Sequence, residues 1–393
     1  MVKFSLVSTC VFWLGTLLTG GAAGFAVVSL GAVWIKGFRT LRGAQPSVGE
    51  PGSPVTLLKP LHGAEPGLYE NLRGCCQQAY PSYQVIFGVR DPEDPAIAVV
   101  EKLRAEFPDL LIDLVIDPRV HGTNLKVSNL LNMLPLARHS WLVLADSDIS
   151  VTEDYLSRVT WPLADPSVGI VTCLYYGVPR SGFWSRMGCL FIDDWFGPSV
   201  RLAHAFGSTR FAFGSTIALR RDALLAVGGL ELLRDTLADD YWLGALTRDA
   251  GLRTVLSDLW VGTDVNERGL TELWEHELRW LRTIRAIAPK GFLMSFVCFT
   301  WPVCLLGLML APSMFNVAIA AVAISARALR FFTVREGQRN KARWFTLALT
   351  PLRDVLLLSE WAAALAGWQV KWRGQSLHAN TLPGNTNGPT HHP

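Results

Sequence analysis

The hydrophobic positions of this chain form long uninterrupted runs towards its two ends and short runs in its middle. Residues 4–35 carry no charge, and about 20 apolar residues suffice to cross a bilayer. Residues 291–312 form a second run of that kind, and residues 313–329 are long enough to return. The pattern therefore predicts a membrane helix in the N-terminal part and further membrane segments in the C-terminal part.

Basic residues follow two of these runs. Lys36, Arg39 and Arg42 come directly after the first run, so the positive-inside rule places the domain that follows it in the cytoplasm. A second basic group lies on the same side by that rule, and it comprises Arg330, Arg335, Arg339, Lys341 and Arg343. A signal peptide is the alternative for residues 4–35, but the uncharged run is too long and no cleavage site is evident. These features favour an uncleaved anchor.

The last apolar stretch, residues 344–369, is interrupted by Arg353, Asp354 and Glu360. Charged side chains at the depth of a bilayer are costly, so this stretch is expected to be re-entrant, interfacial or a short hairpin. The tail after it is rich in Pro, Gly and Asn and is predicted to be disordered.

In the middle of the chain, short apolar runs alternate with amphipathic segments. Predicted strands cover residues 55–61, 83–91, 111–117 and 140–148, and predicted helices cover residues 67–79, 96–107 and 124–137. Strands that are apolar almost throughout and that alternate with helices are typical of a parallel sheet covered on both faces. We therefore predict an α/β fold with a mostly parallel sheet.

Composition narrows the class of protein. Half of the 393 residues are hydrophobic, 18% are charged and 15 are Trp, which indicates membrane contact. The net charge of +3, without a basic stripe interleaved with aromatics, argues against a nucleic-acid partner. The seven Cys form no CxxC pair or Cys/His cluster, so neither a zinc site nor a disulfide framework is expected.

Acidic residues mark the ends of two predicted strands. Asp91 ends one strand, and Asp146 and Asp148 end another with one residue between them. Ligands of such sheets bind beyond the carboxyl ends of the strands. An Asp-x-Asp pair there can hold a divalent cation that also binds phosphates, and the period of a strand would direct both side chains to one face. The alternative is a turn with solvated carboxylates.

A third acidic pair, Asp239 and Asp240, precedes a predicted helix. One Asp is a common helix cap, but two exceed what a cap needs, and one of them can serve as a general base. The helix predicted over residues 273–287 then brings Arg279, Trp280 and Arg282 close together. This segment suits a membrane surface, and its arginines also suit a leaving diphosphate.

Taken in order, "LKPLHG", "VRDPEDPA", "NLKVSNL", "ADSD", "LADDYW" and "HELRW" resemble the motifs of family 2-type glycosyltransferases, in particular the ceramide-glucosyltransferase-like branch, family 21. The resemblance covers roughly residues 53–290. It implies a GT-A fold, with a Rossmann-like mixed, mostly parallel sheet flanked by transmembrane helices. It also implies a Mg²⁺ or Mn²⁺ ion held through Asp146 and Asp148.

The resemblance also implies roles for other residues. Asp91 and Lys126 would contact the nucleotide sugar together with Asp146, and Asp240 would be the catalytic base. Arg279 and Trp280 match the family's Gln/Arg-x-x-Arg-Trp motif, whereas His276 stands where Gln or Arg is usual. Asp239 and His276 are the remaining candidates for a contact with the sugar or the acceptor.

Within this branch, "HGTNLKVSNLLNMLP", "GFWSRMG" and "HELRWLRTIR" are similar to bacterial hopanoid-biosynthesis glycosyltransferases. The implied reaction moves N-acetylglucosamine from its UDP donor to the terminal hydroxyl of bacteriohopanetetrol, at a bacterial inner membrane, with inversion. A ceramide glucosyltransferase using UDP-glucose is the alternative. A processive polysaccharide synthase would need more clean spans, and a non-catalytic scaffold would not need intact acidic motifs.

The expected domains follow from these runs and motifs. They are an anchor (1–42), a linker (43–54), a GT-A domain ending in an interfacial helix (55–290), C-terminal membrane segments (291–370) and a disordered tail (371–393). Residues 180–221, rich in aromatics and glycines, are assigned to the acceptor side by elimination. Within them, Asp193 and Asp194 are expected to be solvated or to cap a helix.

Overall fold

The computed structural model describes residues 2–40, 52–334, 343–372, 375–379 and 382–384. Most of the predicted linker, much of the predicted tail and the basic residues Arg335, Arg339 and Lys341 lie outside the described residues. The chain divides into two compact units. We call Met1–Gly43, Ser181–Gly207 and Glu267–Val370 the helical unit, and Ala44–Arg180, Ser208–Asn266 and Lys371–Pro393 the sheet unit.

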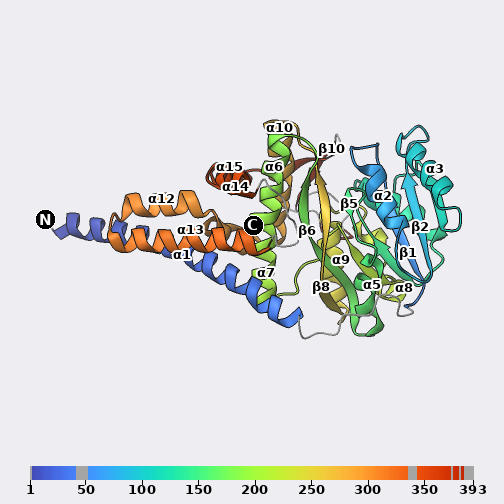
Figure 1. The fold of residues 1–393 in the computed structure, drawn as a ribbon, viewed down its shortest axis with the longest axis horizontal. Coiled ribbons are helices and arrows are strands. Elements are labelled where there is room, and N and C mark those ends of the chain that lie inside the picture. Colours follow the sequence, from blue (N-terminus) through green and yellow to red (C-terminus); the bar gives the residue numbers. More distant parts are fainter. Residues whose placement is uncertain (1, 41–51, 335–342, 373–374, 380–381, 385–393) are drawn as a thin grey trace. The chain divides into compact units, whose positions relative to one another are not determined.

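The sheet unit contains an eight-stranded sheet in the order β3-β2-β1-β4-β7-β6-β8-β5 (Figure 1). Its strands are β1 (Val55–Pro60), β2 (Tyr83–Val89), β3 (Leu111–Ile116), β4 (Trp141–Leu144), β5 (Ile149–Ser150), β6 (Val168–Pro179), β7 (Ile217–Arg220) and β8 (Arg253–Val265). β1 pairs in parallel with β2 and β4, β2 with β3, and β6 with β8. β7 is antiparallel to β4 and β6, and β5 to β8, so the predicted mixed, mostly parallel sheet is confirmed.

Both faces of this sheet are covered, which explains the uninterrupted apolar strands. Leu57 and Leu58 are neighbours on β1 and point to opposite faces, yet both are fully buried in separate hydrophobic clusters. The covering helices are α2 (Leu68–Cys76), α3 (Ala96–Glu106), α4 (Leu125–Met133), α5 (Tyr155–Thr160), α8 (Arg221–Ala226) and α9 (Asp239–Asp249). The predicted strands and helices of residues 55–137 are present.

The strand predicted over residues 140–148 is shorter than expected. β4 ends at Leu144, and Asp146 and Asp148 lie in the bend and turn before β5. Strand period therefore does not apply to these two side chains, because neither residue lies in a strand. The carbonyls after β4 have other partners: Lys59 Nζ donates to Asp146 O (2.5 Å), and Asp264 N of β8 donates to Asp148 O (2.9 Å).

The helical unit contains the apolar segments. Its helices are α1 (Val2–Thr40), α6 (Phe183–Leu190), α7 (Gly197–Ala205), α10 (Leu270–Ile287), α11 (Pro289–Met294), α12 (Thr300–Leu310), α13 (Met314–Val334), α14 (Arg343–Ala348) and α15 (Thr350–Ala364). A π-helical turn, Phe191–Phe196, joins α6 to α7. α1 packs along α12 and α13 (Figure 1). Two short strands, β9 (Gln369–Trp372) and β10 (Gln375–His378), pair with each other after α15.

Two of these helices are long and apolar enough to cross a membrane within the described residues, over Leu6–Val33 and Met314–Thr333. The predicted segment 291–312 is not one straight helix. Pro289–Cys298 and Thr300–Leu310 meet at a bend of 73°, which makes them a broken span or a re-entrant loop.

Asp194 is neither solvated nor a cap. It is buried in the π-helical turn and forms ion pairs with Arg327 (2.5 Å) and Arg330 (2.9 Å) of α13, so that prediction is wrong. Arg327 also pairs with Asp354 of α15. Two carboxylates and two guanidinium groups thus balance one another, because an isolated buried charge would be costly. We call these four residues the balanced network.

Candidate active site

Four of the predicted site residues meet in the sheet unit, where the first turns of α4 and α9 face the bend after β4. Lys126 Nζ lies 2.6 Å from Asp146 Oδ1 and 3.8 Å from Asp239 Oδ2. The side chain of Asn124 caps α4, and its amide also donates to Asp239 Oδ1 (3.1 Å). These contacts bring the nucleotide-sugar candidates Lys126 and Asp146 together with the acidic pair on α9.

Asp240 is held on both carboxylate oxygens. Gly214 N donates to Oδ2 (2.7 Å) and Tyr241 N donates to Oδ1 (2.7 Å). A Cβ atom at Gly214 would lie 2.8 Å from Lys126 Nζ and 3.4 Å from both Asp146 Oδ2 and Asp240 Oδ2. Three charged groups therefore converge on Gly214, where the absence of a side chain leaves room for them.

Asp148 lies in the turn before β5 and is held by β8. Its Oδ2 accepts a hydrogen bond from Thr263 Oγ1 of β8 (3.1 Å). A cavity of about 10 Å³ adjoins it, lined by His62, Gly63, Glu65, Pro66, Leu68, Asn71, Ser147, Asp148 and Asp264. A space of this size accommodates one water molecule or ion.

Sequence reasoning missed Lys59, Asn124 and Gly214. Lys59 is fully buried on β1, and its ammonium fixes the carbonyl of Asp146. A lysine inside an otherwise apolar strand is unusual, and this was the available signal. The roles of Asn124 and Gly214 depend on partners far away in the sequence, and no local pattern reveals them.

The carboxylates of this cluster are difficult to ionise together. Burial and then the charge of Asp146 raise the pKa of Asp148 to about 7. Burial and then the charge of Asp239 raise the pKa of Asp240 to about 6. The pKa of Asp239 is also raised, chiefly by burial. Burial alone would lower the pKa of Lys126, but its three carboxylate neighbours outweigh burial and raise it.

The charges of the cluster fit a divalent cation. Four carboxylates, Asp146, Asp148, Asp239 and Asp240, stand against the two ammonium groups of Lys59 and Lys126. Among the described residues, no three His, Cys, Asp or Glu side chains are placed to share one ion. The protein would thus supply one or two carboxylates and leave the other positions to substrate and water, as is usual for Mg²⁺.

Asp91 follows β2, and parallel pairing through β1 places the ends of β2 and β4 at the same edge of the sheet. Its side chain is exposed, and Oδ1 accepts a hydrogen bond from Glu93 N (2.9 Å). No described contact joins it to Lys126 or Asp146, so its predicted role in nucleotide binding stays a prediction.

The remaining candidates lie on α10, in the helical unit. His276 Nδ1 is 2.5 Å from Glu267 Oε1, and the His276 ring packs edge-on against Trp280, with 4.4 Å between the ring centroids. Arg279 and Trp280 are half-buried. His276 therefore has a packing partner and an ionic partner within this unit.

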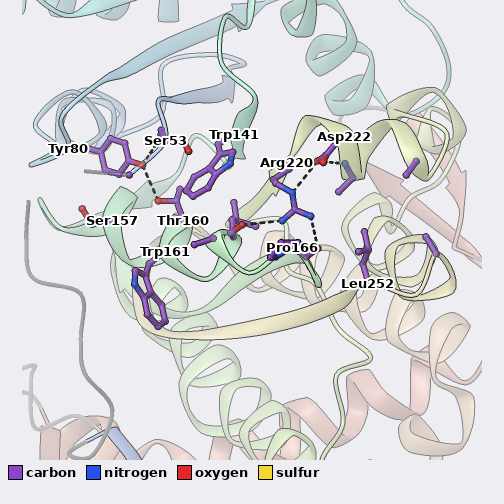
Figure 2. Close-up of a pocket in the computed structure, with 16 residues that line it drawn as sticks. Ser53, Tyr80, Trp141, Ser157, Thr160, Trp161, Pro166, Arg220, Asp222 and Leu252 are labelled. Carbon is purple, nitrogen blue, oxygen red and sulfur yellow. Dashed lines mark hydrogen bonds and ion pairs between the residues drawn. The ribbon is translucent and has the colours of Figure 1, made fainter. Parts of the chain in front are cut away.

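A separate cavity of about 1010 Å³ lies at the amino ends of the strands (Figure 2). Tyr80, Trp141, Thr160, Trp161 and Arg220 line it, and Arg220 donates to the carbonyls of Leu163, Pro166 and Val168. None of the predicted site residues lines this cavity. The perturbed carboxylates gather at the acidic cluster, which makes that cluster the candidate active site.

Known proteins support this reading of the fold. The solved structure of the mannosyltransferase PcManGT from Pyrobaculum calidifontis, in complex with GDP-Man and Mn²⁺, superposes with a TM-score of 0.52 at 21% identity, covering 88% of this chain and 99% of that one. The fold is therefore that of a GT-A glycosyltransferase.

The family follows from the sequence comparisons. A model described as glycosyl transferase family 21 matches residues 21–383, and the chain belongs to this family of glycosyltransferases. Ceramide glucosyltransferase 1 of Caenorhabditis elegans is 27% identical over 207 residues, which are 52% of this chain and 44% of that protein. Ceramide glucosyltransferase 3 of the same organism is 23% identical over 339 residues, which are 82% of this chain and 72% of that protein. The match thus spans less than half the length of the first relative.

Proposed function

We propose that this glycosyltransferase moves N-acetylglucosamine from UDP-N-acetylglucosamine to the terminal hydroxyl of the hopanoid lipid bacteriohopanetetrol. The observation that carries a transfer reaction is the convergence of Lys126, Asp146 and Asp240 around Gly214. The apolar helices and the ceramide glucosyltransferase relatives support a membrane lipid as the acceptor. The resemblance of "HGTNLKVSNLLNMLP", "GFWSRMG" and "HELRWLRTIR" to hopanoid-biosynthesis glycosyltransferases favours a hopanoid over ceramide.

In the proposed mechanism Asp240 takes the proton of the acceptor hydroxyl while that oxygen attacks the anomeric carbon from the face opposite UDP. The two amide donors, Gly214 N and Tyr241 N, fix the direction of the carboxylate. Asp146 and Asp148 would hold Mg²⁺ or Mn²⁺, which when bound neutralises charge on the departing diphosphate. Lys126 adds a fixed positive charge beside Asp146.

We assign the other candidates by the family resemblance. Asp91 contacts the nucleotide, Arg279 adds positive charge at the diphosphate and Trp280 closes the donor site. Asp239 and His276 contact the sugar or the acceptor in this assignment. Residues 1–42 and 291–370 hold the enzyme in a bacterial inner membrane with its catalytic residues on the cytoplasmic side, where nucleotide sugars are available.

A ceramide glucosyltransferase using UDP-glucose is the second candidate, because the curated relatives carry that name. The test expresses the gene in a host that is supplied with bacteriohopanetetrol and ceramide, followed by mass spectrometry of the lipids. We expect a hopanoid heavier by one N-acetylhexosamine. A hexosylceramide would establish the second candidate, and no glycolipid with either acceptor would reject both.

Dependence on metal is tested on the purified enzyme. We expect EDTA to abolish UDP release and Mg²⁺ or Mn²⁺ to restore it, and we expect Asp148→Asn to weaken the restoration. Full activity in EDTA would reject the cation assigned to Asp146 and Asp148.

A further inference from the structure

The helical unit contains a second buried cluster of charges, whose three residues are not members of the balanced network. Arg353 of α15 pairs through Nη2 with Glu277 of α10, and the same nitrogen lies 3.5 Å from Glu360 Oε2. Arg353 and Glu277 are each 2% exposed, and Glu360 is fully buried. We call these three residues the α10–α15 lock.

The lock does not balance its charges. It has two carboxyl groups and one guanidinium group, whereas the balanced network has two of each. Asp354 and Glu267 also act on Arg353, and both are acids. An uncompensated carboxylate at this depth would be costly, so the excess charge needs a partner.

A proton is that partner. Within the described residues, Glu277 Oε1 and Glu360 Oε1 are buried without a hydrogen-bond partner when both groups are carboxylates. Both carboxyl groups approach the same nitrogen, Arg353 Nη2, through their Oε2 atoms. Burial and then Glu360 raise the pKa of Glu277, although Arg353 opposes them. One retained proton supplies a donor and brings the net charge of the lock to zero.

The lock also reaches Trp280. Glu277 precedes Trp280 by three residues on α10, so both lie on neighbouring turns of one helix. Arg353 Cζ lies 5.7 Å from the ring centroid of Phe191, and that ring lies 5.3 Å from the ring of Trp280. Two chains of contacts therefore connect Arg353 to Trp280, one through Glu277 on α10 and one through the ring of Phe191.

We propose that Arg353 is a positioning residue for Trp280 and its neighbour Arg279. We also propose that Glu277 and Glu360 share one proton, which makes the net charge of the α10–α15 lock zero. The positioning role rests on the proposed function, because Arg279 and Trp280 matter to the reaction only in a glycosyltransferase of this type. The shared proton rests on the buried geometry alone.

The test uses the full chain, purified in detergent, and measures thermal unfolding together with kcat and KM for the nucleotide sugar. Glu277→Gln and Glu360→Gln each replace one acid with a neutral isostere, so each single variant should keep the unfolding temperature and kcat. The double variant should have a lower unfolding temperature and a kcat lower by about tenfold or more. Arg353 would then be buried without a carboxylate partner, and α10 would shift. Asp194→Asn, in the balanced network, is the control that should destabilise as a single change.

A triple variant separates positioning from stability. Adding Arg353→Met to the double variant removes the unpaired guanidinium and should restore the unfolding temperature. If Arg353 positions Trp280 and Arg279, kcat stays low and KM for the donor rises, because both residues are assigned to the donor site. Recovery of kcat in the triple variant would overturn the positioning role. If each single Gln variant is as unstable as the double variant, the hypothesis that Glu277 and Glu360 share a proton is overturned. A wild-type enzyme that transfers no sugar rejects the proposed function and the positioning role with it, while the unfolding temperatures still decide the shared proton.

Discussion

Asp240 combines two properties that a general base needs. Its orientation is fixed because each carboxylate oxygen accepts a backbone hydrogen bond. Its pKa is raised to about 6 by burial and by Asp239, so it is ionised at neutral pH and still basic enough to take a proton. The same side chain on an exposed turn would be too weak a base.

Replacing Asp240 with Asn should lower kcat by about 10²–10⁴-fold, the usual contribution of a general base. The amide can still accept one of the two backbone hydrogen bonds, so the fold should survive, which thermal unfolding checks. Asp249→Asn, at the exposed far end of α9, is the matched control and should keep wild-type kcat. An Asp240→Asn enzyme with wild-type turnover would show that the base lies elsewhere.

Asp239→Asn should change the pH dependence. The base works only when ionised, so kcat/KM should rise with pH through the pKa of Asp240, about 6. The charge of Asp239 raises that pKa, so its removal should lower the pKa and move the acid limb of the profile to lower pH. A limb that stays in place or moves to higher pH would contradict the assignment of Asp240. The shift is read independently of any loss in maximal rate.

At the scale of elements, α1 and α12 approach each other at two glycines. A Cβ atom at Gly15 would lie 2.6 Å from the carbonyl oxygen of Gly307, and one at Gly307 would lie 2.7 Å from that of Gly15. Small residues permit such close packing of apolar helices, where dispersion contacts replace the hydrophobic effect.

Gly15→Ala should therefore destabilise the protein, by about 1–3 kcal/mol for an overpacked contact. Gly24→Ala on the same helix is the control, because a Cβ there meets nothing within 4 Å. That change should be neutral or stabilise α1 by up to about 1 kcal/mol through helix propensity. Thermal unfolding in detergent compares the two, and equal effects would mean that α1 and α12 do not pack through Gly15.

The sequence predicts well those elements whose type and burial follow from the spacing of their own polar and apolar residues. β1 is buried on both faces, so its apolar run is uninterrupted, and α10 was visible from its spaced polar residues. The bend between Pro289–Cys298 and Thr300–Leu310 was not predicted, because hydropathy depends on which residues are present and not on where the helix axis changes direction. Asp194 was misjudged because its partners Arg327 and Arg330 lie more than a hundred residues away, and the turn holding Asp146 depends on Lys59 in the same way.

At the scale of the whole molecule, α1 is part of the folded helical unit. The helical unit is built from three separate stretches of chain, and α1 supplies the first of them. Ser29 of α1 accepts a hydrogen bond from Arg330 Nη1 (2.6 Å), and both residues are buried. α1 thereby takes part in the polar core that holds Asp194 and Arg327.

Exchanging residues 2–40 for an unrelated apolar helix of the same length should keep the protein in the membrane fraction but lower its unfolding temperature and activity. The new helix would lack the acceptor for Arg330 and the close approach at Gly15. Ser29→Ala alone should show a smaller loss, since it removes only the hydrogen bond. Wild-type activity in the exchanged protein would reduce α1 to a membrane tether.

The division of the chain into two interleaved units has a consequence for its synthesis. The polypeptide passes from one unit to the other five times, so neither unit is contiguous. As the nascent chain leaves the ribosome, α1 emerges about three hundred residues before Arg330, the donor to its Ser29. The first helix is therefore complete long before Arg330 has been synthesised. Neither unit can be expressed alone by cutting the gene at one point.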